Sequence, residues 1–270
     1  MDETLQLLAR GQGQLLSGGT DFYPALGENH PRTPIIDISG MRELRGITQN
    51  ADHIRIGGLT TWSEIIRAPL PSAFEALKSA AREVGSVQIQ NRATVAGNLC
   101  NASPAADGVP PLLVFDATVE LLSAHGTRHM RLEEFIIGNR RTKRRPDELL
   151  SALLVPRILE KAVSVFQKLG ARRYLVISIS SIAALMLLDE SERISALRIA
   201  VGSCSLVPQR LTALEQELKG AFIHSDLAAK VRREHLAPLS PISDVRATAD
   251  YRLDASRTLV RRALALCAEK

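Results

Sequence analysis

The sequence predicts an α+β protein built from more than one packed unit. Its 270 residues exceed what a single compact core usually needs, and its composition, 45% hydrophobic and 23% charged, is that of an ordinary globular protein. The first half mixes helical and strand periodicities. From about residue 160 onward, three apolar runs precede two helical segments, an order typical of an α+β unit.

The first 60 residues alternate between helix and strand. A short helix is expected over residues 3–9, ended by the glycines that follow it. Apolar runs and alternating patterns predict strands over residues 14–19, 34–40 and 53–59.

The chain is expected to be helical between residues 63 and 85. Apolar residues recur there at spacings of three, four and three, which places them on one helical face, and Gly85 stops the helix. These residues are Phe74, Leu77, Ala81 and Val84.

Strand patterns dominate the next part of the chain. Residues 117–135 predict a hairpin around His125 and Gly126, and residues 148–156 predict another strand. Three further runs predict an antiparallel meander over residues 163–170, 179–189 and 194–208.

Two helices are expected to close the chain. The first covers about residues 225–236 and ends before Pro238. The second begins after Asp254 as its N-cap and places Leu259, Ala263 and Leu266 on one face.

Charge and cysteine content exclude several classes of protein. The net charge is +5, but Lys and Arg are spread along the chain except in the basic run at residues 140–145. That run contains no aromatic residues that could stack on bases, so no nucleic-acid partner is expected. Three distant cysteines provide neither a disulfide framework nor a metal or iron–sulfur site, which indicates a reducing compartment. The acidic start and the short, serine-containing apolar stretch at 175–188 predict a cytoplasmic protein without a membrane span.

Two glycine-containing segments, LLSGGTDF and ATVAGN, carry the candidate chemistry. Backbone N–H groups converge on an anion where no Cβ intervenes, and the Thr20 hydroxyl adds a donor, so these segments could hold a diphosphate. A tight turn at Gly18 and Gly19 is the structural alternative. Asp107, nine residues after Asn98, could accept hydrogen bonds from sugar hydroxyls near a bound phosphate, and a capping or turn role is its structural alternative. The sequence lacks a Gly-Lys-Ser/Thr P-loop, and the Gly11-Gln-Gly13 pair does not follow a strand as a Rossmann fingerprint would.

Several stretches, in order, extend this interpretation: SGGTDFYPAL, RIGGLTTWSEI, VGSVQIQNRATVAGNLCNASPAADGVPPLLVFDATVEL, PDELLSALLVP and SDVRATADYRL. Together they resemble the FAD-binding subunit of molybdenum hydroxylases, the family of the carbon monoxide dehydrogenase medium subunit and the xanthine dehydrogenase flavin domain. The resemblance spans nearly the whole chain. It implies a two-part α/β FAD-binding domain of the PCMH type over residues 1–157, with parts at about 1–50 and 51–157 and FAD between them, and a small α+β C-terminal domain over residues 160–270.

The resemblance also implies a set of cofactor-binding residues. Two segments match those that hold the FAD diphosphate: Leu16, Ser17, Gly18, Gly19, Thr20, Asp21 and Phe22, and then Thr94, Val95, Ala96, Gly97 and Asn98. Asp107 matches an acid that helps to bind FAD, Leu150 a leucine that packs on the cofactor, Lys168 a lysine near the flavin, and Val84 an aromatic position near the ring. Core packing for Leu150 and a solvated position for Lys168 remain open alternatives.

The chain departs from the family pattern at three places. Ala96 stands where a glycine is usual, Gln90 where an arginine is usual, and a further first strand ending in proline is missing, which suggests a shortened start and weaker FAD binding.

The resemblance implies an electron-transfer function without catalytic acid–base residues in this chain. Electrons would pass from [2Fe–2S] clusters on a small partner subunit through FAD to NAD, a quinone or oxygen, while a large molybdopterin subunit oxidises the substrate. Two alternatives remain: a stand-alone FAD-dependent oxidase or reductase, and an assembly subunit that has lost FAD.

Overall fold

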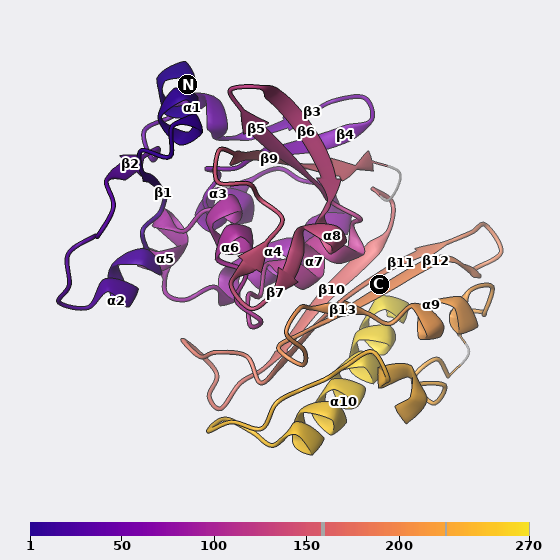
Figure 1. The fold of residues 1–270 in the computed structure, drawn as a ribbon. Coiled ribbons are helices and arrows are strands. Elements are labelled where there is room, and N and C mark those ends of the chain that lie inside the picture. Colours follow the sequence, from indigo (N-terminus) through magenta and orange to yellow (C-terminus); the bar gives the residue numbers. More distant parts are fainter. Residues whose placement is uncertain (158–159, 225, 270) are drawn as a thin grey trace. The chain divides into compact units, whose positions relative to one another are not determined.

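The computed structural model describes residues 1–157, 160–224 and 226–269, which form two compact units (Figure 1). The N-terminal unit comprises Met1–Ala68, Ser86–Ser103 and Asp116–Arg157. The C-terminal unit comprises Pro69–Gly85, Pro104–Phe115 and Ile158–Lys270. Two segments from the first half of the sequence therefore pack within the C-terminal unit.

The main sheet of the N-terminal unit is antiparallel and has the strand order β3-β4-β9-β5-β6. Its strands are β3 (Ile47–Gln49), β4 (His53–Gly57), β9 (Leu149–Pro156), β5 (Thr118–Ser123) and β6 (Gly126–Arg131). The predicted strand at 53–59, the hairpin and the strand at 148–156 are confirmed. Ile54 and Ile56 are fully buried because alternate residues of β4 face the core.

A small parallel sheet pairs β1 (Gln14–Leu16) with β2 (Ile35–Asp37), next to the predicted first helix α1 (Asp2–Ala9). Leu5 and Leu8 of α1 share a core with Ile38, Leu59 and Leu149. The N-terminal unit also contains the short helical elements η1 (Arg42–Leu44) and α8 (Leu132–Phe135). A separate antiparallel pair is formed by β7 (Ile136–Gly138) and β8 (Arg141–Thr142).

The helical stretch predicted between residues 63 and 85 is confirmed, but it is divided into shorter elements. The chain forms α3 (Trp62–Arg67), a 3₁₀ turn η2 (Ser72–Phe74) and α4 (Glu75–Glu83). Pro69 and Pro71 separate them because proline has no N–H for a helical hydrogen bond. Val84 is the extended C-cap residue of α4 rather than part of its apolar face.

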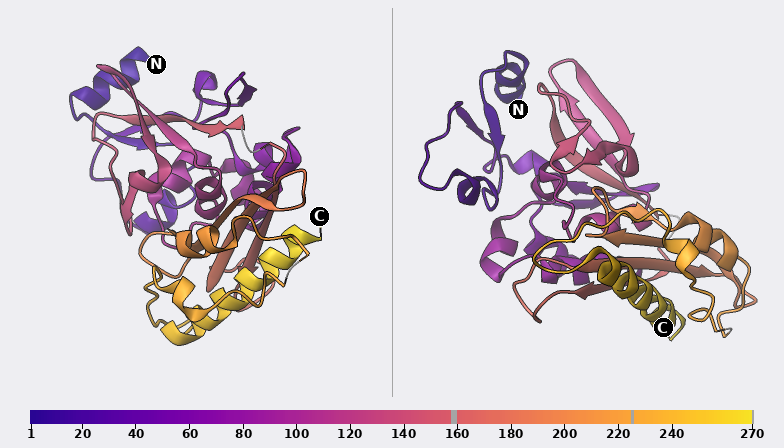
Figure 2. Two further views of the ribbon diagram at one scale, coloured as in Figure 1. Left: turned by 90° about the vertical axis from the view of Figure 1, so that its right-hand side faces the viewer. Right: turned by 60° about the horizontal axis from the view of Figure 1, so that its bottom comes forward.

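The C-terminal unit is built on an antiparallel sheet in sequence order, which confirms the predicted meander. Its strands are β10 (Val163–Leu169), β11 (Ser180–Leu188), β12 (Ile194–Gly202) and β13 (Gln209–Arg210). Alternate residues of β11, such as Ile182 and Ala184, share a core with the long helix α10 (Ala249–Ala268), which runs along the sheet in Figure 2. Helices α4 and α7 (Val109–Val114) contact strands of the same sheet. The Ala76 N–H of α4 donates a hydrogen bond to Ser164 Oγ of β10 at 2.9 Å.

The predicted closing helices need two corrections. The helix expected over residues 225–236 is wrong: the chain forms α9 (Thr212–Leu218) and a 3₁₀ turn η4 (Arg233–Leu236), while residue 225 lies outside the described residues. The last helix begins at Ala249 rather than after Asp254, because the Thr248 side chain caps it by accepting from the Tyr251 N–H at 3.2 Å.

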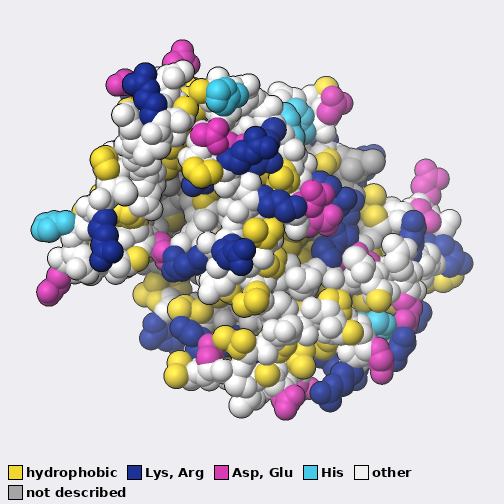
Figure 3. Space-filling model, in the orientation of Figure 1, with side chains coloured by type: hydrophobic (Ala, Val, Ile, Leu, Met, Phe, Trp, Pro, Cys, Tyr) yellow, Lys and Arg dark blue, Asp and Glu magenta, His cyan; other side chains and the backbone are white. Residues whose placement is uncertain are grey.

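The surface carries charges of both signs. On the face drawn in Figure 3, Lys and Arg side chains are interspersed with Asp, Glu and apolar ones. None of the helices in the described part of the chain is both long and apolar enough to cross a membrane.

Candidate functional site

The first glycine segment, residues 16–22, leads from β1 into α2 (Phe22–Leu26). Leu16 is buried at the end of the strand, and Gly19 has a φ of +71°, a conformation that glycine adopts at little cost. Within the described part of the chain, four consecutive amide N–H groups donate no hydrogen bond, those of Gly18, Gly19, Thr20 and Asp21. Successive unpaired N–H groups around a left-handed residue can form a concave anion-binding surface.

A close contact within the protein itself requires glycine at position 18. A Cβ at Gly18 would lie 2.2 Å from the Arg92 carbonyl oxygen, so only glycine allows the segment to approach that turn. At Gly97 a Cβ would lie 2.9 Å from Thr94 Oγ1 and 3.1 Å from Ser17 Oγ. Those two hydroxyls are 3.2 Å apart and hydrogen-bond one another, which joins the two glycine segments.

The second segment, residues 94–98, is the start of helix α6 (Val95–Asn101) with Thr94 as its N-cap, and not a loop. Its amides are already used by the chain. The N–H donors and their acceptors are Val95 to Thr60 O (3.0 Å), Ala96 to Gly58 O (3.1 Å), Gly97 to Thr94 Oγ1 (3.0 Å) and Asn98 to Thr94 O (3.0 Å). The second segment therefore has no free amides among residues 95–98 and contacts the first segment through side chains. The unpaired amides belong to the first segment.

One polar atom of this helix has no partner. Asn98 Oδ1 is buried and accepts no hydrogen bond within the described residues. Leaving such an atom unpaired costs about 1–3 kcal/mol, so the structure retains one unmet polar group beside the joined segments.

Arg140 fixes the far end of the first segment. Its guanidinium donates to the Asp21 carboxylate at 2.8 Å and to Asn101 Oδ1 at 2.7 Å. The Arg140 N–H also donates to the Ala102 carbonyl, although Arg140 has a φ of +54°. The first residue of the basic run 140–145 is thus tied to the candidate site.

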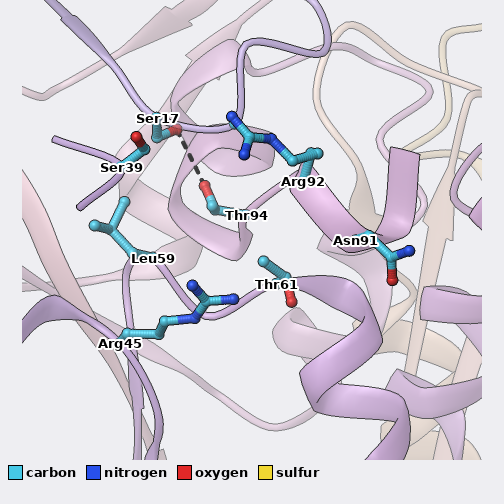
Figure 4. Close-up of a pocket in the computed structure, with 9 residues that line it drawn as sticks. Ser17, Ser39, Arg45, Leu59, Thr61, Asn91, Arg92 and Thr94 are labelled. Carbon is cyan, nitrogen blue, oxygen red and sulfur yellow. Dashed lines mark hydrogen bonds between the residues drawn. The ribbon is translucent and has the colours of Figure 1, made fainter. Parts of the chain in front are cut away.

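A cavity of about 100 Å³ opens beside the joined segments (Figure 4). Its lining contains three of the residues predicted from the sequence: Ser17, Gly18 and Thr94. The other lining residues, which the sequence did not identify, are Ser39, Arg45, Leu59, Thr61, Asn91 and Arg92.

The two arginines of this cavity differ in their contacts. Arg45 donates to the Glu64 carboxylate at 2.7 Å, and Glu64 also caps α3. The Arg92 guanidinium makes no ion pair or hydrogen bond within the described residues. Arg92 ends α5 (Val87–Arg92) just before Thr94 and is exposed, whereas Gln90 on the same helix is buried. The sequence signal that could have identified Arg92 is its position immediately before the segment ATVAGN.

Two other predicted residues meet in the C-terminal unit. Lys168 on β10 donates to Asp107 at 2.6 Å and to the Glu83 carbonyl at 3.3 Å, and Ser178 donates to the other Asp107 oxygen at 2.6 Å. The side chains of Lys168 and Asp107 are only 7% and 8% exposed. Burial raises the pKa of Asp107, and the Lys168 charge and both hydrogen bonds oppose that rise. Lys168 is therefore not a solvated lysine.

Leu150 and Val84 complete the predicted set. Leu150 is 5% exposed on β9, where it pairs with Leu121, and its carbonyl oxygen would lie 2.3 Å from a Cβ at Gly58. Val84 is half-buried at the end of α4. A role of either side chain at a cofactor stays a prediction.

The fold and the glycine segments define a flavoprotein of the molybdopterin dehydrogenase type. Residues 1–158 match the family described as the FAD-binding domain in molybdopterin dehydrogenase, and residues 165–266 match the carbon monoxide dehydrogenase flavoprotein C-terminal domain. The chain belongs to this family, and it is an oxidoreductase subunit with FAD as its cofactor.

Individual relatives agree with this membership. The xanthine dehydrogenase FAD-binding subunit of Escherichia coli O157:H7 is 32% identical over 267 residues, covering 97% of this chain and 91% of the relative. The nicotinate dehydrogenase FAD-subunit of Eubacterium barkeri is 33% identical over 212 residues, covering 77% and 72%. Among solved structures, carbon monoxide dehydrogenase from Hydrogenophaga pseudoflava has a TM-score of 0.89 at 25% identity, covering 98% and 93%.

Proposed function

We propose that this chain is the electron-transfer subunit of a molybdenum hydroxylase. It would accept electrons from [2Fe–2S] clusters on a small partner subunit and pass them through FAD to NAD, a quinone or oxygen. A large molybdopterin subunit would oxidise the substrate, and the complex would work in the cytoplasm. When bound, the isoalloxazine ring of FAD supplies one- and two-electron chemistry, which suits a link between clusters and a two-electron acceptor.

The observation that carries this proposal is the row of unpaired amides in the first glycine segment. The N–H groups of residues 18–21 are free to donate, and the phosphate oxygens of FAD are acceptors of the right charge. The left-handed Gly19 gives the segment the curvature that such a contact requires. Ser17 and Asp21 hold the two sides of the segment through Thr94 and Arg140.

The other predicted residues have distinct proposed roles. Thr94, Val95, Ala96, Gly97 and Asn98 would support the diphosphate segment from α6. Asp107 and Lys168 would form a fixed charged pair at the cofactor, with Val84 and Leu150 providing apolar contacts.

The purified chain tests the proposal directly. We expect an oxidised-flavin absorption spectrum, with the flavin released to the supernatant when the protein is precipitated by acid, because binding is noncovalent. Colour left in the pellet would contradict noncovalent binding, and absence of flavin after incubation with FAD would favour the assembly-subunit alternative. Copurification with a large and a small subunit distinguishes the proposed function from a stand-alone oxidase or reductase.

A further inference from the structure

We propose that the Arg92 guanidinium binds the diphosphate of FAD in the cavity beside the joined glycine segments. This inference rests on the proposed function and assigns to Arg92 a binding role toward the phosphate oxygens. Ser17, Gly18 and Thr94 line the same cavity as Arg92, so the cavity borders both segments and includes Gly18, the first of the four residues with unpaired amides.

The need for a side-chain cation follows from the hydrogen bonds of the backbone. A diphosphate carries full negative charges, whereas the unpaired amides at residues 18–21 provide only partial positive charges. The second segment cannot add amides without losing its own hydrogen bonds, since those of residues 95–98 donate to Gly58, Thr60 and Thr94. A guanidinium supplies a charge together with several donors in a fixed plane, which suits phosphate oxygens.

Arg92 is better placed for this role than Arg45. The carboxylate of Glu64 already neutralises Arg45 at 2.7 Å. Figure 4 shows Arg92 extending toward the Ser17–Thr94 pair, while the neighbouring Asn91 side chain points away. Asn91 accepts a hydrogen bond from Ser63 at 2.5 Å, so its amide is held elsewhere.

Asp37 at the end of β2 is an acidic group that feels the charge of Arg92 and could compete for it. Hydrogen bonds from Ser39 lower the pKa of Asp37, and the charge of Arg92 adds a smaller effect in the same direction. Asp37 and Arg92 make no ion pair within the described residues, so an arriving phosphate does not have to break one.

The test measures FAD affinity of the full-length apoprotein by quenching of flavin fluorescence, at low and at high NaCl concentration. Arg92→Gln should raise the Kd for FAD by about tenfold or more, because a hydrogen bond to a charged group is lost. It should also flatten the salt dependence of the Kd, because one screened charge contact is gone. Arg92→Lys should fall between the wild type and Arg92→Gln, since it keeps the charge but not the planar donors.

Arg67→Gln is the matched control, because Arg67 is an exposed arginine of the same unit that does not line the cavity. It should bind FAD like the wild type. An unchanged Kd in Arg92→Gln would overturn the inference and leave the proposed function intact, provided that the wild type binds FAD. A loss of affinity matched by an equal loss of apoprotein thermal stability would also overturn it, because Arg92 would then act through the fold. A wild type that fails to bind FAD would instead reject the proposed function.

Discussion

Ala96 stands where the family resemblance leads us to expect glycine, and its surroundings explain why a methyl group fits there. Its N–H donates to the Gly58 carbonyl, and the residue is 8% exposed within α6. The methyl group of Ala96 has room because residue 58 is a glycine: a Cβ on residue 58 would come within 3.2 Å of it. Because the amide of residue 96 already donates to Gly58, having alanine in place of glycine there takes no hydrogen-bond donor away from a bound phosphate.

Ala96→Gly should consequently leave the Kd for FAD unchanged while lowering the free energy of unfolding. A glycine inside a helix costs about 1 kcal/mol relative to alanine through backbone entropy. Urea unfolding of the apoprotein and FAD titration measure the two quantities separately. Tighter FAD binding by the glycine variant would contradict this account, because it would mean that the residue 96 amide does face the cofactor.

Arg140→Gln should weaken FAD binding by a few-fold without unfolding the protein. The Arg140–Asp21 pair is about half exposed, with side chains 57% and 49% accessible, and such pairs contribute about 0–1 kcal/mol. The loss would come from a less ordered first segment. Arg141→Gln, which alters the adjacent exposed arginine, is the control, and equal affinities of the two variants would reject a positioning role for Arg140.

At the scale of elements, the ion pair between Lys168 on β10 and Asp107 just before α7 leads to a prediction about how stability depends on pH. Lys168→Met leaves the Asp107 carboxyl buried without its cation, so the folded-state pKa of Asp107, already raised by burial, rises further. The unfolded value is about 3.9. With the folded pKa above the unfolded one, stability is greatest below the unfolded pKa and is lost as pH rises through the folded pKa.

The Lys168→Met variant should therefore be destabilised by about 3–5 kcal/mol near neutral pH and by less as the pH is lowered. Urea unfolding of apoprotein across the pH range gives the comparison with the wild type. Lys161→Met changes an exposed lysine of the same unit and should show neither effect. A destabilisation that does not vary with pH would show that Asp107 is not the group responsible.

Elements differ in how far the sequence predicted them. Strands β4, β9, β10, β11 and β12 were predictable because their buried residues form alternating patterns or long apolar runs. Helices α5, α6 and α7 are six or seven residues long, too short to show a helical period. The caps at Ser86 and Thr94 define the first two, and Ser and Thr are also favoured in turns, so a cap residue alone does not indicate a helix.

The candidate site was predictable only in its local parts. The glycine segments were visible in the sequence, but the cause of the bare backbone at Gly18 is the carbonyl of Arg92, 74 positions away. The same long-range approach brings Arg92 into the cavity with Ser17. Sequence patterns report local periodicity, so they give no measure of which distant turns meet.

At the scale of the whole molecule, the proposed function predicts a division of chemistry between subunits. The chain has three cysteines, and a [2Fe–2S] cluster held by thiolates needs about four. Cys204 and Cys267 are buried, and burial raises the pKa of Cys100 to about 11, which keeps that thiol protonated at neutral pH. The cluster ligands are therefore expected on another chain.

The isolated, FAD-loaded chain should thus fail to oxidise hydroxylase substrates such as xanthine, nicotinate or carbon monoxide. It should still pass electrons from a reduced nicotinamide to an artificial dye if NAD is the physiological acceptor, because that half-reaction needs only the flavin. Anaerobic assays with purified protein measure both activities, and a complex with the proposed large and small subunits would be the positive control for substrate oxidation. Substrate-dependent dye reduction by the pure chain would show that it carries its own substrate site, and the stand-alone oxidase or reductase would then replace the electron-transfer subunit as the better description.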